Sequence, residues 1–220
     1  MKRSLSWIVA LSMGCLILTP TAHADTSCAA WQKAIKAGMA QTRIHAAIDS
    51  PLDPEAAKMG WKQTLMHSIV IDNVQYSNAL HKDFGRTAVA QPELRQMATD
   101  LLGFQAEGGC QAAGREQRGG VDTLVYTAST DLGNGPARLR LWVDSSTGLP
   151  VRAVSDEPAT DTTFSVDKTP GKNAAVVKTT PNGKRIVSTH AYIYGALVKA
   201  PSQGKVDTQA QAALDALLKP

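Results

Sequence analysis

The sequence predicts an α+β protein in which antiparallel strands form one sheet and the helices pack against a single face of that sheet. Two observations predict this class. Apolar and polar residues alternate with a period of two through much of the central chain, for example from Arg138 to Asp144. Apolar residues at helical spacing occur mainly toward the two ends, and no internal repeat or second domain is visible.

The N-terminus has the three parts of a secretory signal peptide. Lys2 and Arg3 make a basic start, an apolar run extends from Leu5 to Leu18, and Ala22-His23-Ala24 fits an A-x-A cleavage site. The alternative of a transmembrane anchor requires about 20 apolar residues, and this run is shorter and interrupted. A lipid-modified Cys15 is a second alternative, but the position three residues before it is not aliphatic.

Removal of the signal peptide, residues 1–24, leaves a single domain, residues 25–220, which we expect in the periplasm. It has 196 residues, because 24 of 220 are lost, and this length suffices for one hydrophobic core. Loss of Lys2 and Arg3 reduces the formal net charge from +4 to +2, and no run of five basic residues exists. We therefore expect no nucleic-acid partner and no transmembrane anchor after cleavage.

Two cysteines remain in the exported chain, Cys28 and Cys110. An even number of cysteines in an exported protein favours a disulfide over two buried thiols, and only one pairing is possible. On the chain-entropy model such a long loop adds roughly 4 kcal/mol of stability. No CxxC spacing is present, so the sequence does not indicate a redox enzyme.

The first expected element is a helix that begins near Cys28. Ser27 can cap this helix, and Trp31, Ile35 and Met39 follow at helical spacing.

The period changes to that of a strand from Gln63 onward. Apolar residues on both sides of Asp72-Asn73 predict a β-hairpin with a two-residue turn. Pro92 then predicts the first turn of a short helix that ends near Gly103.

Two consecutive strands are expected in the central chain. Residues 119–129 place Leu124, Tyr126 and Ala128 on one side. In the second strand one face has Leu139, Leu141 and Val143, and the other has Arg138, Arg140 and Trp142. Gly148 supplies the permissive backbone of the following turn, and Pro150 belongs at the start or edge of the next strand.

The chain from Asp156 to Lys184 is polar, and we expect a loop or a mobile hairpin there, with a short strand at residues 174–180. This segment contains the one loosely basic stretch of the sequence. We expect its basic side chains to be solvated, and their contact with anionic lipid headgroups is the less favoured alternative. Residues 184–195 resume a clean alternation. A last helix is expected from about Thr208, with Ala210, Leu214, Leu217 and Leu218 facing inward.

No catalytic or metal-binding motif is found. His45, His67, His81 and His190 do not pair at helical spacing, and neither HExxH nor GxSxG occurs. The letters SxxK occur at Ser202, but the surrounding proline and glycine oppose the helix that this motif needs. We therefore expect no enzyme activity, no cofactor and no metal. What remains is a set of aromatic and apolar residues, which form either ordinary core or the lining of an apolar cavity: Trp31, Met39, Tyr76, Tyr126, Trp142, Tyr192 and Tyr194.

The segment LRLWVDSSTGLPVR, residues 139–152, resembles paired strands of the lipoprotein-carrier superfamily, the LolA/LolB-like periplasmic proteins. Those proteins show a Trp-hydrophobic-Asp strand, a short turn with Thr-Gly, and Leu-Pro-hydrophobic-Arg. Residues 39–43, the IVIDNVQY hairpin, the GVDTLVYTA strand and the THAYIYGALVKAP strand resemble the family more loosely and in the same order.

The resemblance implies a curved antiparallel sheet, an incomplete barrel, with helices covering its concave face. It further implies a non-catalytic periplasmic protein that binds a lipid or a lipidated, hydrophobic ligand between the sheet and the helices. The alternative is an envelope interaction protein, such as a stress regulator, inhibitor or assembly factor, without a small-molecule ligand. The candidate ligand-binding residues are Trp31, Ile35, Met39, Tyr126, Leu141 and Tyr192.

Overall fold

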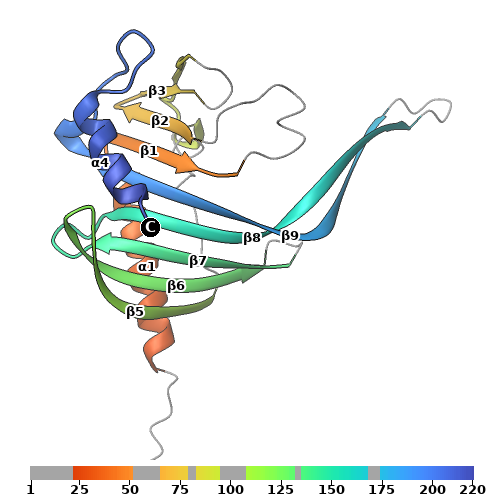
Figure 1. Cartoon of the computed structure of the whole chain (residues 1–220), viewed down its shortest axis with the longest axis horizontal. Coiled ribbons are helices and arrows are strands. Elements are labelled where there is room, and N and C mark those ends of the chain that lie inside the picture. Colours follow the sequence, from red (N-terminus) through yellow and green to blue (C-terminus); the bar gives the residue numbers. More distant parts are fainter. Residues whose placement is uncertain (1–21, 52–64, 79–82, 95–107, 132–134, 168–173) are drawn as a thin grey trace, which may run out of the picture.

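The computed structural model describes residues 22–51, 65–78, 83–94, 108–131, 135–167 and 174–220. Nine strands form one open, curved antiparallel sheet in the order β4-β3-β2-β1-β9-β8-β7-β6-β5 (Figure 1). The strands are β1 Arg43–Asp49, β2 Leu65–Ile71, β3 Val74–Ser77, β4 Gly85–Ala88, β5 Gly108–Arg118, β6 Val121–Asp131, β7 Pro136–Asp144, β8 Pro150–Asp167 and β9 Ala174–Tyr194. The helices are α1 Ala22–Met39, the 3-10 helix η2 Gly195–Leu197 and α4 Thr208–Leu218. The predicted α+β class with a curved, incomplete barrel is confirmed.

Two meanders make up the sheet. Strands β1 to β4 follow one another across one half, and β5 to β9 follow one another across the other half. The halves join where the last strand pairs with the first, with Ala46 of β1 opposite Tyr192 of β9. Because this pairing links segments far apart in the sequence, residues from both ends of the chain lie side by side at the centre of the sheet.

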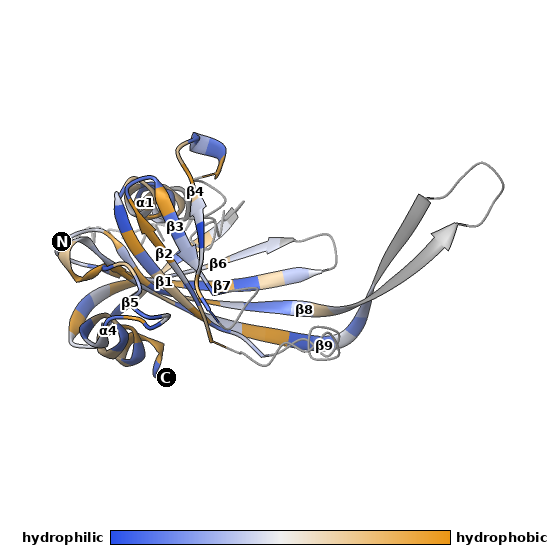
Figure 2. Cartoon of the chain, turned by 90° about the horizontal axis from the view of Figure 1, so that it is seen from above, coloured by the Kyte–Doolittle hydropathy of each residue, from blue (hydrophilic) through white to orange (hydrophobic). Residues whose placement is uncertain are grey.

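Helices α1 and α4 pack on opposite faces of the sheet, so only one of them can cover its concave side (Figure 2). The expectation that the helices share one face is therefore wrong. The reason lies in the alternation of β7: Leu141 faces α1, and its neighbour Trp142 is equally buried on the face that α4 covers. A sheet with apolar residues on both faces needs a cover on both.

The turn between β7 and β8 matches the sequence prediction in detail. Asp144 accepts hydrogen bonds from the backbone N–H and the hydroxyl of Ser146, both at 2.7 Å, and from the hydroxyl of Thr147 at 2.9 Å. Partial burial opposes ionisation, but these hydrogen bonds outweigh it and lower the pKa of Asp144. Gly148 has a φ of 72°, and Pro150 is the first residue of β8. The Trp-Val-Asp strand ends here because its aspartate organises the turn.

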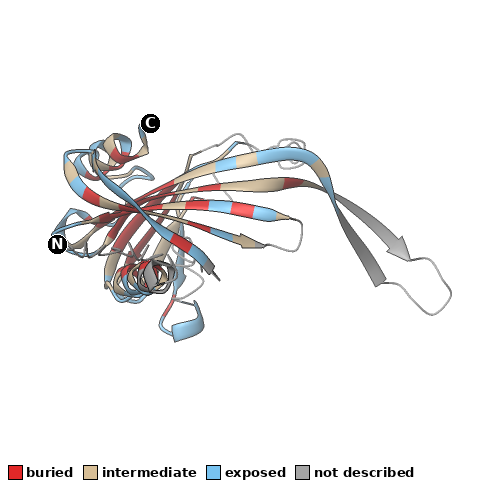
Figure 3. Cartoon of the chain, turned by 90° about the horizontal axis from the view of Figure 1, so that it is seen from below, coloured by how far each residue is buried: buried red, intermediate tan, exposed pale blue. Residues whose placement is uncertain are grey.

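The polar segment 156–184 is mostly strand, which corrects the expectation of a loop while keeping that of a hairpin. Strands β8 and β9 continue together beyond the sheet as a two-stranded arm (Figure 1). Strand β7 pairs with β8 only as far as Asp156, and β1 pairs with β9 only as far as Thr189. Figure 3 shows buried positions concentrated in the body of the sheet and few where the arm begins.

The other predicted elements have mixed outcomes. The Asp72-Asn73 hairpin, the strand of residues 119–129 and the last helix are confirmed. The first helix is also present, but it begins at Ala22, so Ser27 lies inside the helix and does not cap it. Strands β1, β4 and β5 were not expected. The signal peptide lies outside the described residues up to position 21, and the helix expected after Pro92 lies outside them from position 95 onward.

Candidate functional site

The six candidate ligand-binding residues meet in one apolar cluster between α1 and the sheet, here called the α1 cluster. Trp31 and Tyr192 are each 1% exposed, and Ile35 and Leu141 are also buried. Met39 and Tyr126 are partly buried against them. The remaining members are Cys28, Ala34, Ala46, Cys110, Ala128, Leu139, Val143, Ala153 and Tyr194. The sequence pattern therefore placed these side chains on the correct face, although their role as ligand contacts stays a prediction.

A disulfide joins α1 to β5. Cys28 and Cys110 are 82 residues apart in sequence, and their Cα atoms lie 5.0 Å apart. This pairing is the predicted one. The bond fixes the N-terminal half of α1 over the sheet, so that Trp31 and Ile35, one and two turns further along, face the cluster.

The polar groups at the β9 side of the α1 face are neutral at pH 7. Burial raises the pKa of Tyr192 far above its usual value, and burial together with the nearby Tyr192 does the same for Tyr194. Tyr194 donates its hydroxyl hydrogen to the Pro150 carbonyl at 2.8 Å. Burial lowers the pKa of His190 to about 4, and its ring stacks on that of Tyr192 with centroids 6.4 Å apart. This part of the face therefore suits uncharged ligand groups.

The opposite face holds a charged cluster, here called the Trp142 cluster: Glu116, Arg118, Arg140, Trp142 and Arg152. The guanidinium carbons of Arg140, Arg152 and Arg118 lie 4.7, 4.9 and 5.5 Å from the centroid of the indole ring. Glu116 accepts from the Trp142 indole at 2.9 Å, from Arg118 at 3.0 and 3.2 Å, and from Arg140. The indole hydrogen bond first, and then the two arginines, lower the pKa of Glu116 against the opposing effect of burial.

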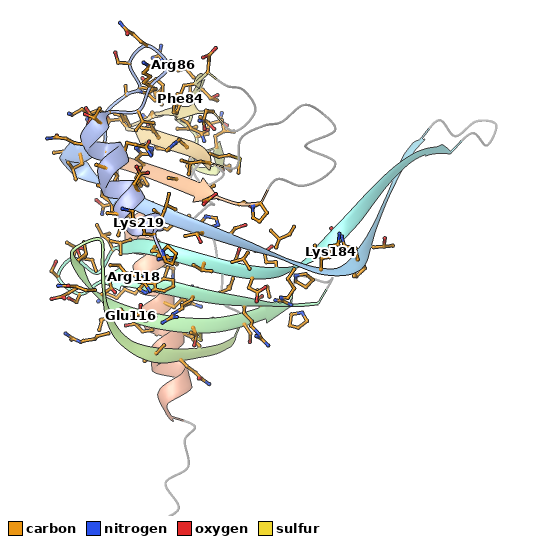
Figure 4. The ribbon with its side chains drawn as sticks, in the orientation of Figure 1. Phe84, Arg86, Glu116, Arg118, Lys184 and Lys219 are labelled. Carbon is orange, nitrogen blue, oxygen red and sulfur yellow. A yellow bond between two sulfur atoms is a disulfide. The ribbon has the colours of Figure 1, made fainter. Side chains whose placement is uncertain are left out.

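Trp142 is a buried core residue, as one of the two expectations for it had it, and it also carries the charged side chains around its ring. Arg152, which lies opposite it on β8, donates to the carbonyl of Lys219 at the end of α4. The C-terminus of a helix attracts cations, because its last carbonyl groups lack partners. Arg152 therefore ties α4 to the sheet. Figure 4 shows Glu116 and Arg118 on β5, with Lys219 at the end of α4 above them.

A second buried feature of the α4 face is a histidine pair. His45 Nε2 lies 3.0 Å from His67 Nδ1, which places a shared hydrogen bond between β1 and β2. Burial, and then His67, lower the pKa of His45 to about 3, while burial lowers that of His67 against the attraction of Asp215. Within the described chain no three His, Cys, Asp or Glu side chains are placed to hold a metal ion. His81 lies outside the described residues.

Two further observations concern the chemistry of the surface. Ser202 and Lys205 pair through their backbones in a tight turn, not in the helix that an SxxK mechanism needs. A hollow of about 280 Å³ at the β5–β6 edge is lined by Arg115, Glu116, Gln117, Asp122 and Thr123, none of which was a candidate ligand residue.

None of the helices in the described ranges is long and apolar enough to cross a membrane.

No protein-family model matches the chain, and no curated protein matches it. Among solved structures it is similar to LprF from Mycobacterium bovis, with 13% identity and a TM-score of 0.45 over 82% of this chain and 98% of that one. It is also similar to lipoprotein LppX from Mycobacterium tuberculosis, with 12% identity and a TM-score of 0.42 over 83% and 99%. A DUF1329 family protein from Desulfovibrio piger has 10% identity and a TM-score of 0.31 over 86% and 98%. The resemblance to the lipoprotein-carrier superfamily stays a prediction.

Proposed function

We propose that the exported chain, residues 25–220, is a non-catalytic periplasmic protein that holds a lipid, or the lipid-bearing part of a lipoprotein, between α1 and the curved sheet. The observation that supports this function is the α1 cluster. It joins side chains from α1 and six strands into one apolar surface without a charged member. Contact with such a surface stabilises an acyl chain by about 0.8 kcal/mol for each buried CH₂ group.

The arrangement of α1 supports the same proposal. The Cys28–Cys110 bond holds the N-terminal half of the helix, while Met39 at its C-terminal end is only partly buried. Met39 and Tyr126 are the two candidate ligand residues that keep some access to solvent. We propose that a ligand first contacts these two side chains and then displaces the C-terminal half of α1 from the sheet.

The test is binding of a fluorescent fatty-acid probe to the mature protein, together with native mass spectrometry for co-purified lipid. Ala128 is 7% exposed in the α1 cluster, so Ala128→Phe fills space that the ligand needs. Ala88 is exposed on the edge strand β4, so Ala88→Phe adds the same bulk away from the cluster. We expect saturable binding by the wild type and by Ala88→Phe, and loss of binding by Ala128→Phe. Absence of saturable binding by the wild type contradicts the proposal.

The β8–β9 arm favours a second candidate function, that of an envelope interaction protein. Beyond Asp156 and Thr189 the two strands pair only with each other among the described residues. An isolated two-stranded ribbon is only marginally stable in water, so contact with another protein would stabilise it.

Site-specific photocrosslinking in intact cells separates the two candidates. A crosslinker at the exposed Lys184, where the arm begins, is compared with one at the exposed Arg86 on β4 (Figure 4). A discrete adduct with one envelope protein from Lys184 alone, without lipid binding in vitro, favours the interaction protein. No adduct from either position, with saturable lipid binding, favours the carrier.

A further inference from the structure

The Trp142 cluster has more positive than negative charge. Three guanidinium groups surround the indole ring, and Glu116 is the one carboxylate that contacts them among the described residues. Arg118 and Arg140 both pair with this carboxylate, and Arg152 does not. The formal charge of the cluster is therefore +2.

Arg152 is the least neutralised member. It is 6% exposed, its one hydrogen-bond acceptor in the described chain is the neutral Lys219 carbonyl, and its Nε is buried without an acceptor. Burial, and then the positive charge of Arg118, lower its pKa against the opposing attraction of Glu116. A buried cation without a direct ion pair is costly, so a further anion near this group would stabilise the fold.

The remaining hydrogen-bond donors of the cluster are available to such an anion. Arg118 uses Nε and Nη2 for Glu116, and Arg140 uses Nη2, which leaves an Nη1 on each without an acceptor among the described residues. The side chain of Arg140 is 42% exposed and that of Arg118 is 24% exposed. Both side chains are therefore partly exposed to solvent, next to the more deeply buried charge of Arg152.

We propose that the Trp142 cluster is a binding site for a phosphate group, held by the free Nη1 donors of Arg118 and Arg140. Guanidinium groups match phosphate oxygens in geometry, and hydrogen bonds between charged groups are about twice as strong as neutral ones. The charge of a phosphate monoester offsets the +2 of the cluster. The phosphate belongs either to a small phosphorylated molecule or to the headgroup of an anionic phospholipid. The site lies on the α4 face, opposite the α1 cluster, so it is independent of the carrier proposal.

The experiment compares the mature wild type with Arg140→Gln and Arg138→Gln. Arg138 is an exposed arginine on the same strand and the same face, outside the cluster, so its variant has the same change in net charge. Titration calorimetry measures binding of inorganic phosphate. Flotation measures binding to vesicles of phosphatidylcholine alone or mixed with phosphatidylglycerol. Urea midpoints with and without phosphate show that each variant is folded, and Arg118→Gln provides a second test of the same site.

We expect Arg140→Gln and Arg118→Gln to weaken phosphate binding about tenfold or more, because each removes a charge-assisted hydrogen bond. Arg138→Gln should bind like the wild type. Binding of free phosphate without vesicle binding identifies a small phosphorylated ligand, whereas vesicle binding that needs phosphatidylglycerol identifies a headgroup. The proposal is overturned if neither probe binds saturably, or if Arg138→Gln weakens binding as much as Arg140→Gln. In that case Arg118 and Arg140 serve only to pair with Glu116, and Arg152 serves only to hold α4.

Discussion

Acidification from pH 7 to pH 5 should destabilise the fold, because three histidines are buried in the neutral state. Burial lowers the pKa of His45 to about 3 and that of His190 to about 4, and it also lowers the pKa of His67. In the unfolded chain each has a pKa near 6.5. Below this value the unfolded state binds protons that the folded state does not bind. The free energy of unfolding is therefore greatest above about pH 7 and decreases as the pH falls toward 4.

The size of the effect follows from the gap between the unfolded pKa and the working pH. At pH 5 this gap is about 1.5 units, which corresponds to about 2 kcal/mol for each histidine that stays neutral in the fold. His45 and His190 together should remove about 4 kcal/mol, a large part of the 5–15 kcal/mol typical of a domain. Carboxylates do not mask this loss. Glu116 and Asp144 have lowered pKa values, so their stabilisation persists down to about pH 4.

Urea unfolding of the mature protein at pH 7, 6 and 5, followed by tryptophan fluorescence, measures this loss. His190→Gln and His45→Gln should each be less stable than the wild type at pH 7, because both remove a packed side chain. Each should also reduce the difference in unfolding free energy between pH 7 and pH 5 by about 2 kcal/mol. The reasoning is refuted if the urea midpoint is the same at pH 7 and 5, or if both variants keep the full pH dependence of the wild type.

Three further predictions concern stability and are checked by the same urea unfolding at pH 7. Replacing Cys28 and Cys110 together by serine should lower the free energy of unfolding by about 4–5 kcal/mol, since the bond closes a loop of 82 residues. Leu141→Ala should cost about 2–5 kcal/mol, because Leu141 is fully buried; a smaller loss would indicate that the α1 cluster already contains a void. Gly119→Ala should cost more than Gly120→Ala. Both have positive φ, but only at Gly119 would a Cβ meet a leucine of α4, at 3.1 Å.

The strands that the sequence predicted are those with one strong alternation, and the missed ones lack it for physical reasons. Strand β1 has five consecutive buried residues, from Ile44 to Ile48, because both of its faces are covered. A strand buried on both faces shows no period of two. Strand β5 is an edge strand rich in glycine and polar residues, and its pairing with β6 has two register shifts, at Gly108–Gln111 and at Ala112–Gly114. Bulges of this kind interrupt the pattern that identifies a strand.

The two clusters differ in how far the sequence could predict them. The members of the α1 cluster on β6 and β7 follow from alternation alone, which placed Tyr126 and Leu141 on one face. The Trp142 cluster depends on the register of neighbouring strands. Alternation put Arg140 beside Trp142, but Glu116 and Arg118 reach them across β6, and Arg152 reaches them from β8. The His45–His67 contact is likewise set by the pairing of β1 with β2. The register of the strands is fixed by turns and packing across the whole sheet, so it cannot be predicted from a local sequence pattern.

The alternation of β7 also separates the two proposals physically. Leu141 and Trp142 are neighbours in sequence, yet one contributes to an uncharged surface under α1 and the other to a charged cluster under α4. An apolar ligand is favoured by the first environment, and an anion is favoured only by the second. Ala128→Phe should therefore abolish fatty-acid binding and leave phosphate binding intact, while Arg140→Gln should do the reverse. A variant on one face that removed both activities would show that the two sites are coupled through the strand. Binding of a single lipid at both sites would not explain that result, because its chain and its headgroup would lie on opposite faces of a packed sheet.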